Sequence, residues 1–238
     1  MQKFLVGETT QKILSDLKTD VWFSKSTTST NAVARNEVSE VKSDLKVYLS
    51  DHQSAGRGRR QNTWTDTGQG EALLSSWSFS FSKNPQPILA PLVGLAIYQN
   101  LKKHFRHLNF SIKAPNDILL SEEKLCGILI ENVLSQTQGR SVIGIGLNVF
   151  DSPKNLNATH LSAHHEVNRT TWQDFITDLK FDLFSALKNS QHENLSHEAC
   201  SQLLQALKNN RQLSGELLEV TPKGSLIFKN QQIDWHSL

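Results

Sequence analysis

The sequence predicts an α+β domain in which helices back a mixed, mostly antiparallel sheet, with a small β unit at its C-terminal end. Apolar strand-like segments and amphipathic helical segments follow each other irregularly, without the regular strand–helix–strand repeat of a parallel sheet. Two long apolar strands are expected at 125–134 and 142–150, and Gln138-Gly139 between them favours a hairpin. After residue 210 the helical pattern ends and short strands follow.

Helix expectations rest on apolar residues at helical spacing and on capping signals. Helices are expected at 8–17, 32–38, 87–105, 170–187 and 197–207. The hydroxyl-rich stretch 26–31 would lie at the N-terminus of the second helix, and Thr170 and Gln173 have the spacing of a capping box. We expect the helix at 170–187 to bury an apolar face that includes Trp172 and Phe175 against the core.

Strand expectations rest on short apolar runs and on period-two alternation, as where Trp77, Phe79 and Phe81 alternate with serines. Strands are expected at 46–49, 77–81, 110–112, 125–134, 142–150, 217–220 and 225–228. The change of character near Asn210 divides the chain into a main domain, 1–210, and a short C-terminal β unit, 211–238.

Size and composition fit one globular core. The chain has 238 residues, of which 37% are hydrophobic and 20% are charged. A net charge of +2 gives no bulk attraction to nucleic acid or to a membrane surface. Cys126 and Cys200 supply no disulfide framework, and no apolar run reaches the length of a membrane span. We therefore expect a cytoplasmic protein, and the histidine and cysteine spacings indicate no zinc site.

The run Gly56–Arg60, with sequence GRGRR, interleaves glycines with arginines. Glycine lets the backbone approach a ligand closely, and arginine offers forked donors to carboxylates and phosphates. A solvated basic loop or a nucleic-acid patch would also be basic. A disordered nucleic-acid-binding tail would repeat the run, whereas here it occurs once between apparent strands. The pattern favours a loop that binds an anionic ligand.

Three further motifs lie at the ends of expected strands. In the stretch 113–117, turn chemistry explains the proline, asparagine and aspartate but leaves Lys113 unexplained. Lys124 precedes an apolar strand in which Gly127 indicates close approach of another group. Cys126 in that strand is interpreted as a packing residue. The stretch 144–148 has two alternate glycines before Asn148, which alone is weak evidence for a site.

In this order and spacing, five motifs resemble those of the catalytic domain of biotin protein ligases. They are Ser29-Thr30-Asn31, GRGRR (56–60), KAPNDI (113–118), EKLCGILIEN (123–132) and GIGLNV (144–149). The resemblance covers roughly residues 20–235. It implies a class II synthetase-like mixed sheet backed by helices, followed by an SH3-like β domain.

The resemblance also implies a two-step reaction. Biotin, the substrate, and ATP give biotinyl-5′-AMP and pyrophosphate with the help of Mg²⁺. A lysine of a biotin carboxyl carrier protein, from acetyl-CoA carboxylase or a related carboxylase, then attacks the mixed anhydride and releases AMP.

Site residues follow from the resemblance, position by position. Biotin would contact Ser29, Thr30, Asn31, Gln53, Gly56, Arg57, Gly58, Arg59, Lys124 and Gly127. ATP would contact Arg59, Arg60, Lys113, Asn116, Asp117, Lys124 and Asn148. The catalytic set would be Lys124, Arg59 and Asp117, and Asp117 would also serve as a Mg²⁺ ligand.

The chain departs from the family pattern at several positions. Gln61 stands where many members have glycine, and Ala114 stands where tryptophan is usual. About 25 residues follow Gln212, so the SH3-like unit looks truncated. The 28 residues before Ser29 are too few for a winged helix, so a monofunctional ligase without a DNA partner is expected.

Other functions remain open from the sequence. A lipoate or octanoate ligase or transferase would share the fold. A nucleic-acid-binding module would use the basic loop and would show steep salt dependence. A degenerate member would sense biotin without turnover. Family members can dimerise by pairing sheet edges, and one sequence does not identify such an edge or the carrier protein.

Overall fold

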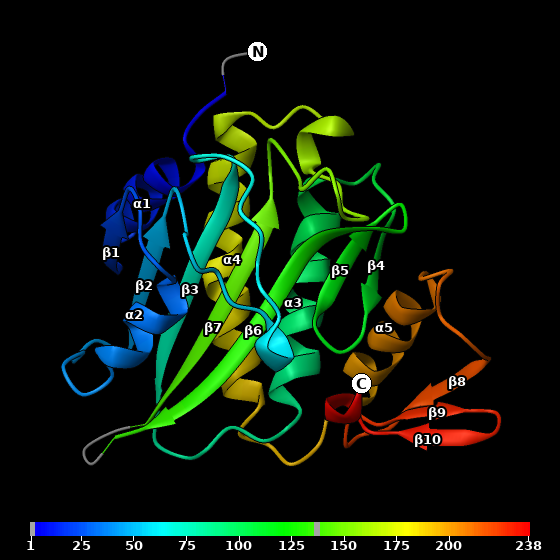
Figure 1. Cartoon of the computed structure of the whole chain (residues 1–238). Helices are drawn as coiled ribbons and strands as arrows, with labels where there is room; N and C mark the ends of the chain where they lie inside the picture. Colours follow the sequence, from blue (N-terminus) through cyan, green and yellow to red (C-terminus); the bar gives the residue numbers. More distant parts are fainter. Residues whose placement is uncertain (1–2, 136–138) are drawn as a thin grey trace. The chain divides into compact units, whose positions relative to one another are not determined.

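The computed structural model describes residues 3–135 and 139–238, without the side chain of Gln61 (Figure 1). These residues form two compact units. The first unit comprises Met1–Ser82 and Leu125–Thr177, and the second comprises Lys83–Lys124 and Asp178–Leu238. The turn predicted at Gln138-Gly139 lies partly outside the described residues. The departure from the family pattern at Gln61 concerns a side chain that also lies outside them.

The first unit is built on a mixed sheet with the strand order β1-β2-β3-β7-β6. Its strands are β1 (Asp20–Ser24), β2 (Leu45–Ser50), β3 (Ala72–Phe81), β6 (Glu123–Leu134) and β7 (Gly139–Asn148). Its helical elements are α1 (Val6–Asp16), α2 (Thr30–Asn36), η1 (Arg59–Gln61), η2 (Leu161–Ala163) and the first part of α4 (Arg169–Asn189). β1 runs parallel to β2, and the other described neighbours are antiparallel. The predicted α+β class with a mixed, mostly antiparallel sheet is confirmed.

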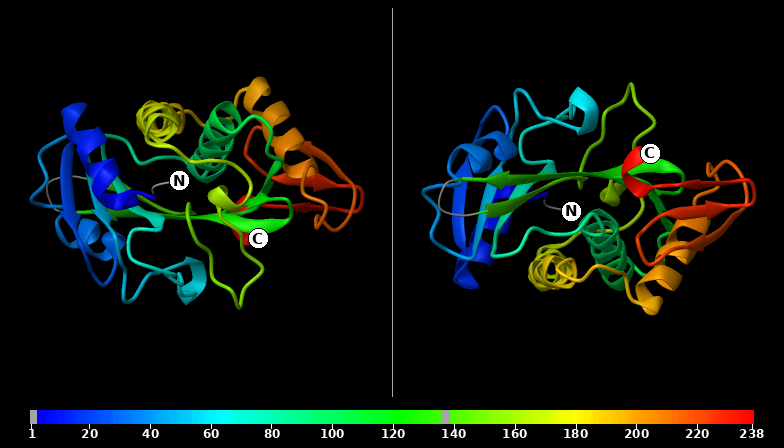
Figure 2. Two further views of the ribbon diagram at one scale, coloured as in Figure 1. Left: turned by 90° about the horizontal axis from the view of Figure 1, so that it is seen from above. Right: turned by 90° about the horizontal axis from the view of Figure 1, so that it is seen from below.

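One face of this sheet carries several small residues near the middle of β7. Ser76 of β3 and Leu129 of β6 lie opposite Gly144 of β7, and one step along the sheet Gly127 lies opposite Gly146. Residues paired across strands share a face, so these side chains and glycines lie on the same side. Figure 2 shows α2 and the η1 segment on one side of the sheet and the first part of α4 on the other. We call the side that carries α2 the α2 face.

Aromatic side chains pack against one another in another part of the first unit. The ring of Phe4 lies 4.9 Å from that of Phe150 and 6.2 Å from that of Trp172, and Trp172 stacks on Phe175 at 5.2 Å. Trp172 is fully buried, and its Nε1 donates to Thr10 Oγ1 of α1 at 3.0 Å. A buried indole N–H needs such a partner. The helical stripe predicted from the sequence therefore does pack into the core.

The predicted capping box at the start of α4 is wrong. The helix begins at Arg169, and Asn168 Oδ1 accepts a hydrogen bond from the backbone N–H of Thr171 at 2.9 Å. Asparagine is among the best N-cap residues, and Asn168 satisfies the N–H of Thr171, whereas Thr170 as the cap would have satisfied the N–H of Gln173. Thr170 consequently lies inside the helix.

The second unit contains three helices and two small β elements. The helices are α3 (Leu89–His104), the rest of α4 and α5 (His197–Lys208), and a short 3-10 helix, η3 (Trp235–Ser237), follows near the C-terminus. One β element is the hairpin of β4 (Phe110–Lys113) and β5 (Asp117–Leu120). The other is the antiparallel sheet of β8 (Leu217–Val220), β9 (Leu226–Phe228) and β10 (Gln231–Ile233). β8 packs against α5. The small C-terminal β unit is confirmed, and the boundary at residue 210 stays a prediction.

Three short strands, β1, β5 and β10, were missed. Each has three to five residues, and β5 begins at Asp117, the end of the stretch 113–117 that turn chemistry explained. Most of the longer elements lie within a few residues of their predicted positions, as α3 does for the helix expected at 87–105. In the part of the chain that the structure describes, no helix combines the length and apolar character that a membrane span requires.

Candidate functional site

The N-terminus of α2 carries the first predicted site residues. Ser29 is the N-cap, and its hydroxyl accepts from the backbone N–H of Ala32 at 3.5 Å. The helix therefore starts at Thr30, two residues before its predicted start, because serine is a preferred N-cap residue. Ser29, Thr30 and Asn31 are each at most 4% exposed, so three polar side chains are buried at one helix end.

A hydrogen-bond network connects this helix end to Gln53 and to the sheet. Gln53 Oε1 accepts from the backbone N–H of Thr30 at 2.7 Å and lies 3.2 Å from Thr30 Oγ1. Thr30 Oγ1 also lies 2.7 Å from Ser76 Oγ, which donates to Asn31 Oδ1. The structure thus brings Thr30, Asn31 and Gln53 together, as the resemblance implies. Ser76 was missed, although its place among the alternating serines of β3 marked it as a residue on the polar face.

Asp66 holds the backbone next to Gln53. Its Oδ2 accepts from the backbone N–H of Gln53 at 2.9 Å and lies 2.8 Å from His52 Nδ1. The Asp66 side chain is 3% exposed, so these contacts are shielded from water. Asp66 was also missed, because a lone aspartate in a loop carries no distinctive sequence signal.

Glu131 joins α2 to the arginine-rich loop. Its Oε2 accepts from Asn31 Nδ2 at 3.0 Å. Its Oε1 lies 3.1 Å from Arg35 Nη1 and 3.9 Å from Arg57 Nη1. The EKLCGILIEN motif contains this glutamate, but no role was assigned to it from the sequence. It lies on the α2 face, in the same alternating row of β6 as Gly127.

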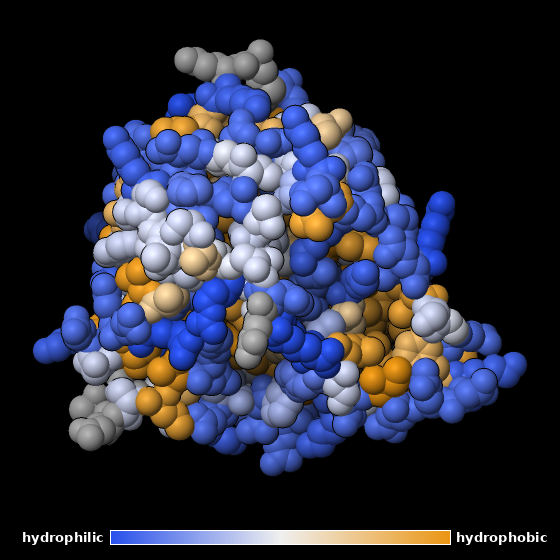
Figure 3. All heavy atoms as spheres, viewed as in Figure 1, coloured by the Kyte–Doolittle hydropathy of each residue, from blue (hydrophilic) through white to orange (hydrophobic). Residues whose placement is uncertain are grey.

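The arginine-rich loop folds back on itself. Trp64 N donates to Gly56 O at 3.0 Å, Gly58 N donates to Asn62 O at 2.7 Å, and Arg57 forms an antiparallel bridge with Thr63. Strongly hydrophilic side chains gather over the η1 segment in Figure 3. Burial, followed by the nearby charge of Arg60, lowers the pKa of the Arg59 guanidinium, which still stays protonated at neutral pH. The loop therefore presents fixed positive charge.

Trp64 is a further residue of this region that was not predicted from the sequence. A Cβ on Gly146 would come within 2.7 Å of its ring, and a Cβ on Gly56 would come within 2.8 Å of its backbone oxygen. Glycine at both positions therefore lets this segment lie directly on β7. The two alternate glycines of GIGLNV, weak evidence alone, thus have a packing reason.

Gly144 supports a stability prediction. Its missing side chain leaves room for the amide of Asn31, which a Cβ would overlap, whereas a Cβ on Gly94 of α3 would meet nothing within 4 Å. We expect Gly144→Ala to destabilise the fold by about 1–3 kcal/mol through overpacking. The control Gly94→Ala should be neutral or stabilising by about 0.5–1 kcal/mol, since alanine favours a helix. Urea unfolding of both variants checks this, and equal stabilities would contradict it.

The second unit holds the other predicted residues. Lys124 Nζ lies 2.8 Å from Asp117 Oδ1, so two members of the predicted catalytic set form an ion pair. Lys113 is exposed and lies opposite Asp117 at the closed end of the β4–β5 hairpin. The loop between them is anchored by η3, because Trp235 Nε1 donates to Pro115 O at 2.8 Å and Trp235 is 3% exposed. Trp235 was not singled out from the sequence.

Two predicted residues of the first unit lie within the sheet. Gly127 lies opposite Gly146, and Asn148 is buried at the end of β7 with its Nδ2 donating to Thr159 O at 3.0 Å. The first unit thus carries Ser29, Thr30, Asn31, Gln53, Gly56–Arg60, Gly127 and Asn148, and the second carries Lys113, Asn116, Asp117 and Lys124.

The donor set for a cation is small. Within residues 3–135 and 139–238, no group of three or more histidine, cysteine, aspartate or glutamate side chains could hold a metal ion. Mg²⁺ in nucleotide sites commonly takes one or two carboxylates, with substrate phosphates and water completing its shell. Asp117, with the neighbouring amide Asn116, fits that arrangement and does not fit an all-protein metal cage.

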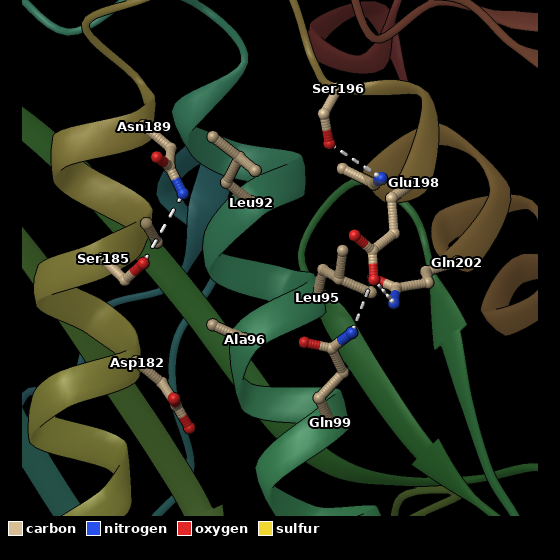
Figure 4. Close-up of a pocket in the computed structure, with 12 residues that line it drawn as sticks. Leu92, Leu95, Ala96, Gln99, Asp182, Ser185, Asn189, Ser196, Glu198 and Gln202 are labelled. Atoms are coloured by element: carbon tan, nitrogen blue, oxygen red, sulfur yellow. Dashed lines mark hydrogen bonds between the residues drawn. The ribbon is translucent and has the colours of Figure 1, made fainter.

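The pocket in Figure 4 lies elsewhere in the second unit, between α3, α4 and α5, and has a volume of about 280 Å³. None of the site residues predicted from the sequence lines it. Its walls carry Asp182 and Ser185 of α4 and Glu198 and Gln202 of α5, while Leu92 and Ala96 of α3 lie on its floor. The polar motifs and this pocket are therefore separate features.

The chain belongs to the biotin/lipoate A/B protein ligase family, whose model matches residues 23–148, just over half of the chain. Its fold resembles that of the biotin protein ligase from Aquifex aeolicus in complex with biotin and ATP. The TM-score is 0.65, with 21% identity over 90% of this chain and 94% of that one. A biotin acetyl coenzyme A carboxylase synthetase from Helicobacter pylori gives a TM-score of 0.64, with 20% identity over 91% of this chain and 99% of the other.

Sequence relatives match over shorter spans. The bifunctional ligase/repressor BirA of Bacillus subtilis is 36% identical over 111 residues, 45% of this chain and 33% of the relative. The biotin–[acetyl-CoA-carboxylase] ligase of Mycobacterium tuberculosis is 30% identical over 145 residues, 55% of this chain and 50% of the relative. The chain thus spans a third to a half of the length of these curated relatives.

Proposed function

We propose that this protein is an ATP-dependent biotin protein ligase. It would form biotinyl-5′-AMP from biotin and ATP, and would then transfer biotin to a lysine of a biotin carboxyl carrier protein. The observation that carries the proposal is the buried polar network at the start of α2, which Glu131 connects to Arg57 of the arginine-rich loop. Relatives named as biotin ligases and solved biotin ligases of the same fold support it.

The α2 network suits the polar head of biotin. A cyclic urea offers one carbonyl acceptor and two N–H donors, and Ser29, Thr30, Asn31 and Gln53 offer hydroxyl and amide groups that complement both kinds. Ser29, Thr30 and Asn31 are buried, Gln53 is half-buried, and the hydrogen bonds among them exist in advance, so little reorganisation would accompany binding. Gly127 carries no side chain on the same face of the sheet, which would permit close approach of the ligand there, whereas Asn31 and Trp64 lie over Gly144 and Gly146.

The arginines can offset the repulsion between the two negative groups that meet in adenylation. A biotin carboxylate must attack the α-phosphate of ATP, so two negative groups approach each other. Arg57 and Arg59 would hold carboxylate and phosphate oxygens from the first unit, with Arg60 on the nucleotide. The loop would exclude water and protect the anhydride from hydrolysis, and Gly56 and Gly58 let its backbone lie close to the ligand.

Residues of the second unit would serve the nucleotide and the transfer step. Lys124 would neutralise charge on the biotin carboxylate and the α-phosphate, and Lys113 would bind phosphate oxygens. Asp117 would accept a proton from the incoming lysine of the carrier, and Asn116 would bind the nucleotide. Asn148 of the first unit would contact the triphosphate or its metal. Bound Mg²⁺ at Asp117 would supply charge neutralisation that helps pyrophosphate leave.

A lipoate or octanoate ligase is the second candidate, because the family that matches the chain includes both chemistries. The two differ at the ligand head, where biotin carries a polar ureido ring and lipoate carries an apolar dithiolane. A buried row of hydroxyl and amide groups favours the polar head, because a ureido ring can exchange hydrogen bonds with these groups and an apolar dithiolane cannot.

Exchange of labelled pyrophosphate into ATP, with Mg²⁺ and without a carrier protein, tests the proposal. We expect exchange that requires biotin and that neither lipoate nor octanoate supports. Exchange with lipoate instead would establish the second candidate. A folded sample that binds biotin but shows no exchange would contradict turnover and favour a biotin sensor.

A further inference from the structure

We infer that Glu131 is a positioning residue that holds Arg57 of the loop and Asn31 of α2 on one carboxylate, so that retention of the adenylate depends on it. The inference rests on the proposed function. Glu131 would not touch the reacting atoms; it would act through the two residues that do contact the ligand.

The contacts of Glu131 are divided between its two oxygens. Oε2 accepts from Asn31 Nδ2 at 3.0 Å, while Oε1 lies 3.1 Å from Arg35 Nη1 and 3.9 Å from Arg57 Nη1. The Glu131 side chain is 20% exposed, while those of Arg35 and Arg57 are 40% and 48% exposed, so the carboxylate is the better shielded member of each pair. One carboxylate therefore connects a helix terminus, the next turn of that helix and a loop.

Arg35 is the closer partner of the Glu131 carboxylate, and this leaves Arg57 with a longer contact. Glu131 Oε1 lies 3.1 Å from Arg35 Nη1 and 3.9 Å from Arg57 Nη1. A guanidinium has five N–H donors, so one long contact orients Arg57 and leaves donors available for a ligand carboxylate or phosphate. Glu131 would thus aim Arg57 without saturating it.

The charges of the group support binding of an anion. Two arginines surround one glutamate, so the cluster keeps one net positive charge beside the loop. If Glu131 were absent, Arg57 would lose its orienting partner and Asn31 Nδ2 would lose its acceptor. Asn31, which would place the biotin head, and Arg57, which would close the loop over it, would then no longer be held by the same carboxylate.

A double-mutant cycle in the full chain tests this role. We would measure the dissociation rate of biotinyl-5′-AMP from the parent, Glu131→Gln, Arg57→Gln and the double variant. We expect Glu131→Gln to raise the rate about tenfold, a size within the range of coupled neighbours. Because Glu131 would act partly through Arg57 and partly through Asn31, Glu131→Gln should raise the rate by a smaller factor in the Arg57→Gln background than in the parent. Fully additive effects would overturn the inference.

A matched control separates positioning from general stability. Glu37 of the α2 C-terminus pairs with Lys46 at 2.9 Å and accepts from Tyr48 Oη at 3.0 Å, and it is 28% exposed. Glu37→Gln should lower thermal stability to an extent similar to Glu131→Gln, yet leave the dissociation rate unchanged. Equal rates in the two variants would overturn the inference. If the parent protein forms no adenylate, the proposed function and this inference are both overturned. If the parent and Glu131→Gln form the adenylate and release it at the same rate, only this inference is overturned.

Discussion

Lys124→Ala should lower the rate of biotin-dependent pyrophosphate exchange by a factor of about 10²–10³, the usual loss when a donor to developing charge is removed. Lys124 forms a 2.8 Å ion pair with Asp117, and its side chain is 38% exposed, so it is held in place and accessible to a ligand. The adenylation step concentrates negative charge as the carboxylate meets the α-phosphate. Alanine leaves that charge without a neutralising ammonium group.

The control for this prediction is Lys12→Ala. Lys12 also forms a 2.8 Å ion pair, with Glu8, but on the exposed face of α1. Its removal should leave the exchange rate unchanged and cost less than about 1 kcal/mol of stability. Circular dichroism would verify that both variants are folded. A Lys124→Ala protein with the exchange rate of the parent would remove Lys124 from the mechanism.

Arg140→Met should reduce the free energy of unfolding by about 3 kcal/mol, because it leaves several buried oxygens without donors. Arg140 is fully buried in β7. Its guanidinium donates to Ser78 Oγ at 2.8 Å, to Ser78 O at 2.6 Å and to Ser43 O at 2.9 Å. Burial lowers the pKa of this group, and its hydrogen bonds compensate the cost of burying the charge. Methionine fills a similar length but donates nothing.

The control for Arg140 is Arg106→Met. Arg106 also donates to a backbone oxygen, that of Lys103 at 3.3 Å, but it does so at the exposed surface. Water can replace that bond, so its loss should change the free energy of unfolding by less than about 0.5 kcal/mol. Urea denaturation of the two variants compares them directly. Equal midpoints would show that the Arg140 contacts contribute little to stability.

The fold was predictable where local pattern is strong. The alternation at Trp77, Phe79 and Phe81 identifies β3, and the long apolar helix identifies α3, since each pattern extends over several repeats. The strands β5 and β10 escaped prediction because β5 begins at Asp117, in a stretch typical of a turn, and β10, with sequence QQI, has no apolar run. The cap of α4 was misplaced because several adjacent residues are acceptable caps, and only the folded chain selects Asn168.

The sequence by itself determined the residue types of the candidate site: the polar triad before α2, the GRGRR loop, and Lys113, Asp117 and Lys124. Motifs are local, and these lie within short stretches of chain. Only the tertiary structure decided which distant residues support them. Glu131 meets Asn31 across 100 positions, and Trp235 meets Pro115 across 120. Contacts of this kind depend on strand register and helix packing, which no short sequence window specifies.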